Sequence, residues 1–226
     1  AAARIYATAG SAAVYWGMGI SQSTHGTDNT LAITNLALMC GQLGREGTGL
    51  NPLRGQNNVQ GCSDSGGLPN VFTAYQRVDD SEISERFAAA WNRPELSLTP
   101  GLTVIELVDG AHAGAIKAFY IMGEDPLTSE PNLNHARESL EHLDFIVCQD
   151  IFHNSTTQMA DVVLPSCSFA EKDGTFTNSD RRVQLVRRAL QPIGQSRADW
   201  EIVCDLAGRL ERRLGQTPSA GWSYSH

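Results

Sequence analysis

Residues 117–165 read KAFYIMGEDPLTSEPNLNHARESLEHLDFIVCQDIFHNSTTQMADVVLP, and this stretch decides the fold class. The segment 131–143 has the pattern of a helix, and 154–160 predicts a short helical link. Three short apolar runs, each bounded by polar or turn residues, predict strands at 117–123, 144–152 and 161–165. Strands and helices that alternate in this way indicate an α/β fold with a Rossmann-like, mostly parallel sheet, its strands covered on both faces by flanking helices.

Polar residues follow each of these strands. The strand ends are MGEDP (122–126), QDIF (149–152) and LPSCS (164–168), and ligands of parallel sheets bind at such carboxyl ends. The carboxylates of Asp125 and Asp150 are suited to ribose hydroxyls or a guanine edge, because each accepts two N–H or O–H donors. Aspartate is equally common as a helix N-cap or turn former, so a structural role stays an open alternative.

The sequence upstream of this region predicts another strand and helix. SAAVYWGMGI (11–20) is typical of a short strand running into glycines, and Thr27 or Asp28 can cap the helix that follows up to Leu43. Apolar residues nearly surround this helix, so we expect it to be buried within a larger body. Further helices are expected in 78–92 and 102–114.

Downstream of residue 168 the pattern changes again. EKDGTFTNSDRRVQLV (171–186) is typical of a hairpin or loop pair with a turn at Gly174, followed by a strand. RADWEIVCDLAGRLERRLG (197–215) predicts an amphipathic helix that Gly215 ends.

The segment 41–67 is rich in glycine and in polar side chains, and it has few periodic apolar positions. Its glycines allow backbone to pass close to a ligand, and NPLRGQNNVQG (51–61) offers many hydrogen-bond donors. A long surface loop is the alternative reading. Arg54 in this setting is suited to a small carboxylate, since a guanidinium binds two oxygens in one plane and stays charged.

Composition excludes several functional classes. The chain has 226 residues with 17 Lys+Arg, 25 Asp+Glu and a net charge of −8, which argues against a nucleic-acid partner. No apolar run approaches the roughly 20 residues that cross a bilayer, so we expect no membrane span. The five cysteines are widely spaced without a CxxC pair, which argues against a disulfide framework and indicates a reduced, cytoplasmic setting.

Several familiar catalytic motifs fail here. GMGISQ lacks the third glycine of a dinucleotide fingerprint, GQLGREGTG has no P-loop lysine, and there is no GxSxG elbow beside Ser23, Thr24 and His25. The other histidines lack the spacing of metal ligands, although His135 and His142 can share one helix face as solvated residues. We therefore predict no metal ligand within this sequence.

Four segments, 17–70, 120–132, 147–184 and 198–210, together resemble the catalytic subunit of molybdenum- or tungsten-dependent formate dehydrogenases, within the molybdopterin bis(guanine dinucleotide) oxidoreductases. NPLRGQNNVQG (51–61) is specific to the formate dehydrogenase branch, most similar to the soluble NAD-dependent type. ADVVLP (160–165) followed by EKDGTFTNSDRRVQ (171–184) marks the wider family. The resemblance implies oxidation of formate to CO₂, or the reverse, with electrons passing through iron–sulfur centres to NAD.

The resemblance also implies roles for individual residues. Arg54 matches the arginine that orients formate, and Gln56 and Asn57 line the pterin site. The positions matching the guanine dinucleotide site at the strand ends are Gly123, Glu124, Asp125, Gln149 and Asp150. The chain passes the cofactor again at Asp173, Gly174 and Thr175.

The sequence holds only some of the elements that this resemblance implies. None of the five cysteines precedes a histidine as the Cys or selenocysteine metal ligand does, and a [4Fe–4S] cluster motif is missing. We therefore expect an incomplete, interior part of a multidomain chain. Residues 1–56 would end one α/β cofactor-binding domain, 57–168 would belong to a second Rossmann-like, guanine-dinucleotide-binding domain, and 169–226 would begin the following cofactor-contacting region.

The partners implied are formate or CO₂, the rest of the catalytic chain, and iron–sulfur and NAD- or flavin-binding electron-transfer subunits. Two alternatives stay open at this point. One is another molybdopterin oxidoreductase such as a nitrate reductase, and the other is a non-catalytic scaffold that keeps the fold without the metal ligand.

Overall fold

The computed structural model describes residues 1–215, which fall into two compact units. The first unit combines residues 1–63 with 176–184, and the second combines 64–175 with the chain from 185 onward. Each unit combines two segments that are separate in the sequence. The three-domain division expected from the sequence stays a prediction. Within the described residues, no helix combines the length and apolar character needed to span a bilayer.

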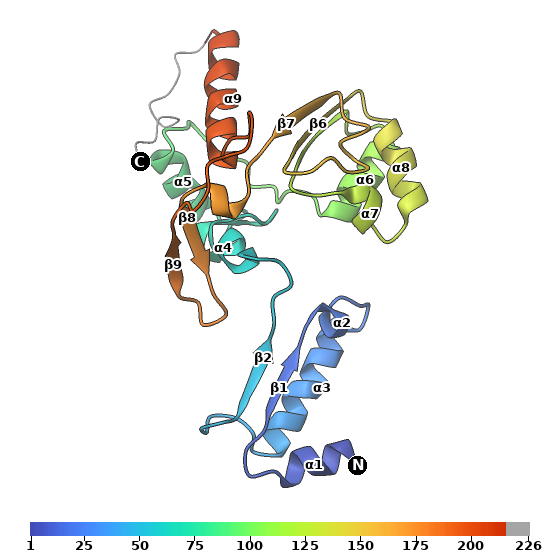
Figure 1. Ribbon diagram of the computed structural model, residues 1–226, viewed down its shortest axis with the longest axis vertical. Coiled ribbons are helices and arrows are strands. Elements are labelled where there is room, and N and C mark those ends of the chain that lie inside the picture. The colour runs from blue at the N-terminus through green and yellow to red at the C-terminus, as the bar shows by residue number, and fades with distance from the viewer. Residues whose placement is uncertain (216–226) are drawn as a thin grey trace. The chain divides into compact units, whose positions relative to one another are not determined.

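The first unit is built around one parallel strand pair with a helix in its crossover (Figure 1). Strands β1 (Ala13–Trp16) and β2 (Gly49–Pro52) pair from Ala13 opposite Gly49 to Trp16 opposite Pro52. The connection between them carries α3 (Gly26–Met39). The other helices of this part are α1 (Ala2–Thr8), α2 (Met18–Ser21) and α4 (Val59–Asp64).

The buried side chain of Gln42 ties the start of this unit together. Its Nε2 donates to the carbonyl oxygens of Tyr6 at 3.3 Å and Ala9 at 2.9 Å, while its Oε1 accepts from Ala12 N at 3.0 Å. These bonds satisfy the carbonyl groups at the end of α1, which otherwise lack partners. Gln42 thereby fixes the entry of the chain into β1.

The structure bears on three interpretations of the sequence in the first unit. Helix α3 begins at Gly26, before the expected caps Thr27 and Asp28. Gly26 fits at this position because it has no Cβ, which would lie 1.9 Å from Ser21 O. The alternative interpretation of 41–67 as a long surface loop is wrong, because this segment contains β2 and α4. Within its own unit α3 is not enclosed, as Leu38 is 55% and Met39 85% exposed, and its burial within a larger body stays a prediction.

The second unit holds the parallel sheet that the sequence predicts. Its strands are β5 (Ala118–Met122), β6 (Phe145–Asp150) and β7 (Val162–Pro165), in the order β5-β6-β7. The register runs from Ala118 opposite Phe145 and from Val147 opposite Val162. The prediction of an α/β fold with parallel strands and flanking helices is confirmed.

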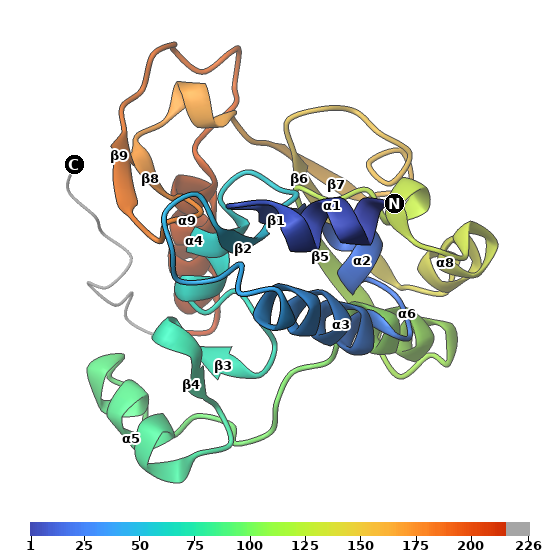
Figure 2. The same ribbon diagram turned by 90° about the horizontal axis from the view of Figure 1, so that it is seen from below.

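The helices of this sheet gather on one face, and both views agree on their side (Figure 2). They are α6 (Val104–His112), α7 (Pro126–Ser129) and α8 (Leu133–Glu141). The core lies between sheet and helices and is formed by Leu127, Ala136, Leu140, Ile146 and Cys148. At about 25 cal/mol per Å² of apolar surface, such burial is the main stabilising term of this layer.

The expected covering of the strands on both faces is met only in part in this unit, because the opposite face is covered at the buried Gln149, which hydrogen bonds to Asp199 at the start of α9 (Asp199–Arg213). Right-handed crossovers that move in one direction along a sheet place their helices on one face. The second crossover also lacks a helix, because 154–160 forms turns rather than the expected helical link. Phe145 is 45% and Met122 44% exposed on the opposite face.

The remaining elements connect and extend these layers. An aromatic group of Phe72, Phe87 and Trp91 joins a short hairpin to the helix after it, with the stacked Phe72 and Phe87 rings 4.5 Å apart. The expected turn at Gly174 is wrong, because Gly174 begins a strand and the turn follows at 178–182. The elements are β3 (Val71–Phe72), η1 (Thr73–Tyr75), β4 (Gln76–Arg77), α5 (Ser81–Ala90), η2 (Phe169–Glu171), β8 (Gly174–Thr177), β9 (Val183–Val186) and α9 (Asp199–Arg213).

Candidate functional site

Arg54 lies on an open groove of about 400 Å³ in the first unit. The groove is lined by the loop after β2 and by the tip of the β8–β9 hairpin, that is, by residues 54–60 and 177–179. The exposed Arg54 donates from Nη2 to the Oε1 of the buried Gln60 at 3.0 Å. A buried amide thus fixes one edge of the guanidinium, while the side chain as a whole faces solvent. The exposed amides of Gln56 and Asn57 lie in the same groove.

The groove keeps its shape because two distant segments are tied at Asn58. Its backbone adopts a φ of 62°, a left-handed conformation that asparagine tolerates better than most residues. Its Oδ1 accepts a hydrogen bond from Thr177 N at 2.9 Å. Gly61 makes room for this side chain, since a Cβ there would lie 2.2 Å from Asn58 Oδ1. The segment 177–179 was not among the residues expected at the site, and no local signal joins it to Arg54.

The carboxyl edge of the three-stranded sheet brings together the residues expected at the strand ends. Gly123 follows β5 with a φ of 65° and donates from its N–H to Gln149 O at 2.9 Å. Asp150 is the last residue of β6. The exposed Glu124 and the partly buried Asp125 follow Gly123 directly. This edge belongs to the second unit, whereas the Arg54 groove belongs to the first.

Gln149 is fully buried and joins a chain of side chains that the sequence analysis did not anticipate. Its Oε1 accepts from the Tyr120 hydroxyl, and its Nε2 donates to Asp199 Oδ1 at 2.9 Å. The Asp199 carboxylate also pairs with Lys172 Nζ. Burial, with the Asp199 charge, raises the pKa of the Tyr120 hydroxyl, which therefore stays protonated at neutral pH. Gln149 thus acts first as a connector between β6 and the start of α9.

The Asp125 carboxylate is already engaged by its own chain. Its Oδ1 accepts from Thr156 N at 3.1 Å and Thr156 Oγ1 at 2.5 Å, and its Oδ2 accepts from Thr128 Oγ1 at 2.5 Å. Burial raises the pKa of this carboxyl, but these hydrogen bonds outweigh burial and hold it below its usual value. Asp125 is therefore charged and internally bonded at neutral pH.

The Asp150 carboxylate is also bonded within its own chain. Its Oδ1 accepts from the N–H groups of Ile151 at 2.6 Å and Phe152 at 3.1 Å, and its Oδ2 accepts from Asn154 Nδ2 at 2.9 Å. This is the geometry of an aspartate that shapes the turn after its own strand. The structure displays the turn-forming role of Asp125 and Asp150, and their cofactor-binding role stays a prediction.

Asp173 lines a second hollow, of about 350 Å³, together with Lys172, Arg188 and Trp200. Its carboxylate accepts from Arg188 N at 2.6 Å and lies 3.5 Å from Arg187 Nη1. The hydrogen bond from Arg188 N, together with the Arg187 charge, holds the pKa of Asp173 below its usual value. Gly174 and Thr175 follow as exposed residues at the start of β8.

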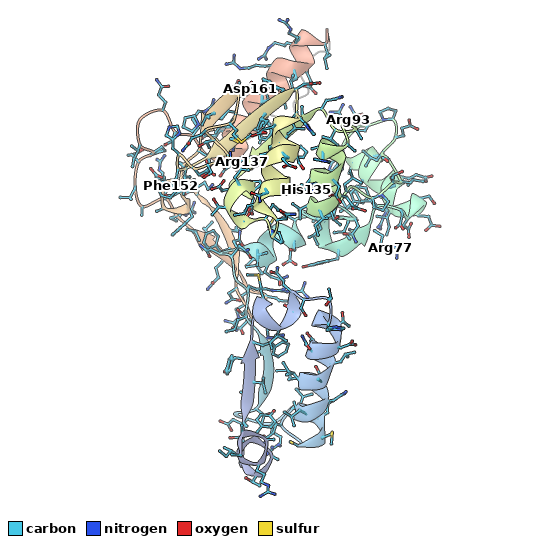
Figure 3. All side chains as sticks on the ribbon, turned by 90° about the vertical axis from the view of Figure 1, so that its right-hand side faces the viewer. Arg77, Arg93, His135, Arg137, Phe152 and Asp161 are labelled. Atoms are coloured by element: carbon cyan, nitrogen blue, oxygen red, sulfur yellow. The ribbon has the colours of Figure 1, made fainter. Side chains whose placement is uncertain are left out.

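A cluster of histidines lies where α6 and α8 face each other. Figure 3 labels His135 at this place, and the His112 and His135 ring centroids are 4.8 Å apart. Ligand atoms of His112, His135 and Glu138 all lie within 4.8 Å of one another. The sequence predicted no metal ligands because the histidine spacing is irregular along the chain. The sequence signal that could have indicated this cluster is the three-residue spacing of His135 and Glu138 on one helix.

Comparison with known proteins finds similarity over most of the chain. The model of the molybdopterin oxidoreductase family matches residues 3–209. The chain belongs to this family. A relative, the F420-dependent formate dehydrogenase subunit alpha of Methanocaldococcus jannaschii, is 50% identical over 208 residues, which are 92% of this chain and 30% of the relative.

Two further relatives of this family member have similar descriptions. The F420-dependent formate dehydrogenase 2 subunit alpha of Methanococcus maripaludis is 47% identical over 92% of this chain and 30% of its own length. Formate dehydrogenase H of Escherichia coli is 43% identical over 92% of this chain and 29% of its own length. The chain thus spans about three tenths of the length of these relatives. The resemblance to the molybdopterin oxidoreductases is confirmed.

Proposed function

We propose that the protein containing this chain is a formate dehydrogenase that interconverts formate and CO₂ in the cytoplasm. Three relatives at 43–50% identity are named formate dehydrogenases or their alpha subunits, which supports this substrate. Electrons would leave through iron–sulfur centres to NAD, through partner subunits that bind iron–sulfur clusters and flavin or NAD. Two relatives are named as F420-dependent, so F420 is the alternative electron acceptor to NAD.

The observation that carries the proposal is the presentation of Arg54. Gln60 holds one nitrogen of the guanidinium, and the rest of the fork faces an open groove whose walls are mainly amides. A planar carboxylate the size of formate fits such a fork through two parallel hydrogen bonds. The charge of Arg54 persists at every working pH, so formate would be bound as its anion and held in one orientation.

The molybdopterin cofactor that the family implies, with molybdenum or tungsten and two guanine dinucleotides, would supply the two-electron redox centre. The donors present fit such a group. Gln56 and Asn57 offer exposed amides that both donate and accept, as a pterin edge requires. Gly123 and Glu124 present exposed backbone and a carboxylate at the sheet edge. The hollow beside Asp173, Gly174 and Thr175 would be the third contact, and the [4Fe–4S] cluster would be held outside this sequence.

Asp125, Gln149 and Asp150 would serve this cofactor indirectly. Their side chains are bonded within the chain, so they would shape the turns whose backbone groups meet the dinucleotide. This modifies the role implied by the resemblance, in which the side chains themselves would contact the guanine dinucleotide. Substitutions distinguish the two roles. Replacing a residue that only positions a turn lowers local stability, whereas replacing a residue that contacts the cofactor lowers cofactor binding without a loss of stability.

The test is steady-state formate oxidation by the full-length protein with Arg54→Lys. The change keeps the charge but removes the planar fork, and we expect turnover to fall about 10²–10³-fold, as for the loss of one preorganised donor at a reacting group. Arg77→Lys is the matched control, since Arg77 is an exposed residue of β4 paired with Asp79. It should retain wild-type turnover and molybdenum or tungsten content.

Three outcomes would count against the proposal. Wild-type turnover in Arg54→Lys, at full metal content, removes the assigned role of Arg54. Nitrate reduction without formate oxidation by the unaltered protein would favour the nitrate reductase alternative. Absence of molybdenum and tungsten from the native assembly would favour a scaffold. Assays with NAD and with F420 decide the electron acceptor.

A further inference from the structure

The region between α6 and α8 gathers potential metal ligands from two helices. His112 is the last residue of α6, and His135 and Glu138 lie three residues apart on α8, so both point to the same side of that helix. One ligand atom from each of the three residues lies within 4.8 Å of the others. Helices α6 and α8 also pack directly against each other, which holds these residues in register.

Two further contacts orient the imidazoles. The His135 Nε2 lies 2.9 Å from Asp109 Oδ1, and the His142 Nδ1 lies 3.0 Å from His112 O. A carboxylate bonded to one nitrogen of an imidazole is the usual partner of a metal-binding histidine, because it fixes the tautomer and raises basicity. His142 also packs its ring on that of His112, with centroids 5.1 Å apart.

The local charge favours a cation at this position. Asp109 and Glu138 bring two carboxylates, and the carboxyl end of α6 adds the partial negative charge of its helix dipole next to His112. The first turn of α8 carries the positive end of its helix dipole and disfavours a cation near His135. The Asp109 carboxylate, whose Oδ1 lies 2.9 Å from His135 Nε2, offsets this effect. Imidazole and carboxylate together are ligands for zinc and similar divalent transition metals.

We propose that His112, His135 and Glu138 bind a divalent transition-metal ion such as Zn²⁺, which joins α6 to α8. Asp109 is the positioning residue for His135, and water completes the coordination. Zinc bonds of about 2.0–2.1 Å in a tetrahedron place ligand atoms about 3.4 Å apart. The ligand atoms of the three side chains lie within 4.8 Å of one another, so a pair at that distance must approach by about 1.4 Å to bind one Zn²⁺ ion. His112 and Glu138 are exposed side chains that can rotate to do so.

The site would be structural rather than catalytic. The ion links the end of one helix to the start of another on the same face of the sheet, so it would restrain the layer that covers β5 and β6. None of these residues belongs to the set assigned to formate or to the molybdopterin cofactor. The proposal therefore stands or falls independently of the formate dehydrogenase function.

The test is equilibrium dialysis of the full-length protein against buffered Zn²⁺, with zinc and molybdenum or tungsten counted by mass spectrometry. The unaltered protein should take up about one Zn²⁺ per chain more than His135→Ala, with at least tenfold weaker binding in the variant. Glu138→Gln should show the same loss and serves if His135→Ala fails to fold. The matched controls are His153→Ala and Glu141→Gln, both exposed and outside the cluster.

Hydrogen exchange supplies a second readout in the same samples. Added Zn²⁺ should slow deuterium uptake in 133–141 of the unaltered protein and of both controls, but not of His135→Ala or Glu138→Gln. Equal zinc uptake by the unaltered protein and both cluster variants would overturn the proposal. The same conclusion follows if zinc leaves exchange in α8 unchanged, or if the controls lose as much binding as the cluster variants. The three histidines would then only stack and hydrogen bond.

Discussion

The Arg54 groove and the carboxyl edge of the β5-β6-β7 sheet contain similar polar residues but use them differently. In the groove, one buried amide anchors an exposed guanidinium, and most of the neighbouring side chains face solvent. At the sheet edge, the buried Gln149 and the carboxylates of Asp125 and Asp150 are bonded to their own chain. Polar residues at a strand end can therefore already have partners within the chain, and a cofactor-contacting role for Asp125, Gln149 and Asp150 stays a prediction.

The largest effect that would sharpen this contrast is expected from Gln149→Leu. The change keeps the volume but leaves the Tyr120 hydroxyl without its acceptor and Asp199 without one donor. Leaving buried polar groups without hydrogen-bond partners costs about 2 kcal/mol, which corresponds to roughly thirtyfold faster hydrogen exchange in β6. Hydrogen exchange of 145–150 in the full-length protein measures this effect.

Arg54→Lys is the matched comparison for Gln149→Leu. It should leave exchange throughout the β5-β6-β7 sheet unchanged while turnover falls, because Arg54 belongs to the other unit. Unchanged exchange of β6 in Gln149→Leu, combined with a loss of cofactor, would instead make Gln149 a direct ligand contact. The contrast between the two regions would then be wrong.

A smaller effect is expected inside the groove from Gly61→Ala. The added Cβ would lie 2.2 Å from Asn58 Oδ1, so the Asn58 side chain must move and release Thr177 N. We expect kcat/KM for formate to fall about tenfold, the loss of roughly 1.4 kcal/mol, because the groove loses one wall rather than its guanidinium. The measurement is steady-state kinetics at full metal content.

Gly208→Ala controls for the general effect of replacing a helical glycine. A Cβ at Gly208 would meet only Arg212 Nη1 at 3.8 Å, which is ordinary contact distance. This variant should keep wild-type kcat/KM and stabilise α9 by about 0.5–1 kcal/mol. Equal kinetics in Gly61→Ala and the unaltered protein would show that the Asn58 contact does not shape the groove.

The sequence predicted the elements that local pattern determines. Apolar runs located β5, β6 and β7, and the amphipathic stripe located α9. In the expected link 154–160, Asn154 and Thr157 satisfy each other's backbone N–H groups, with Thr157 N 2.8 Å from Asn154 Oδ1 and Asn154 N 2.8 Å from Thr157 Oγ1. This reciprocal pairing is typical of a helix N-terminus, but the segment continues as turns.

Elements that depend on distant contacts escaped prediction. Strand β2 forms only by pairing with β1, so its own glycine-rich segment gave no sign of a strand. Thr177 joins Asn58 across 119 positions in the chain, and His112 meets His135 only because α6 packs on α8. The position of Arg54 could be read from its motif, whereas the wall opposite it and the histidine cluster could not.

The smallest effect concerns the charge of Asp125. Hydrogen bonds from Thr128 and Thr156 outweigh burial and lower the pKa of this carboxyl in the folded state, so the folded protein favours the charged form. That contribution is complete above the unfolded pKa of about 3.9 and is lost as pH falls through the lower folded pKa. Asp125→Asn should therefore speed exchange in 126–129 at pH 7 by about fivefold, or roughly 1 kcal/mol.

The difference between Asp125→Asn and the unaltered protein should then shrink as pH falls below 4, because protonation removes the same charge that the substitution removes. Glu141→Gln, an exposed substitution on α8, should leave exchange in 126–129 unchanged at every pH. A difference that persists undiminished at low pH would mean that Asp125 acts through shape alone. If exchange at pH 7 is unaltered but cofactor is lost, the Asp125 carboxylate itself contacts the dinucleotide, and the sheet edge resembles the Arg54 groove more closely than its hydrogen bonds indicate.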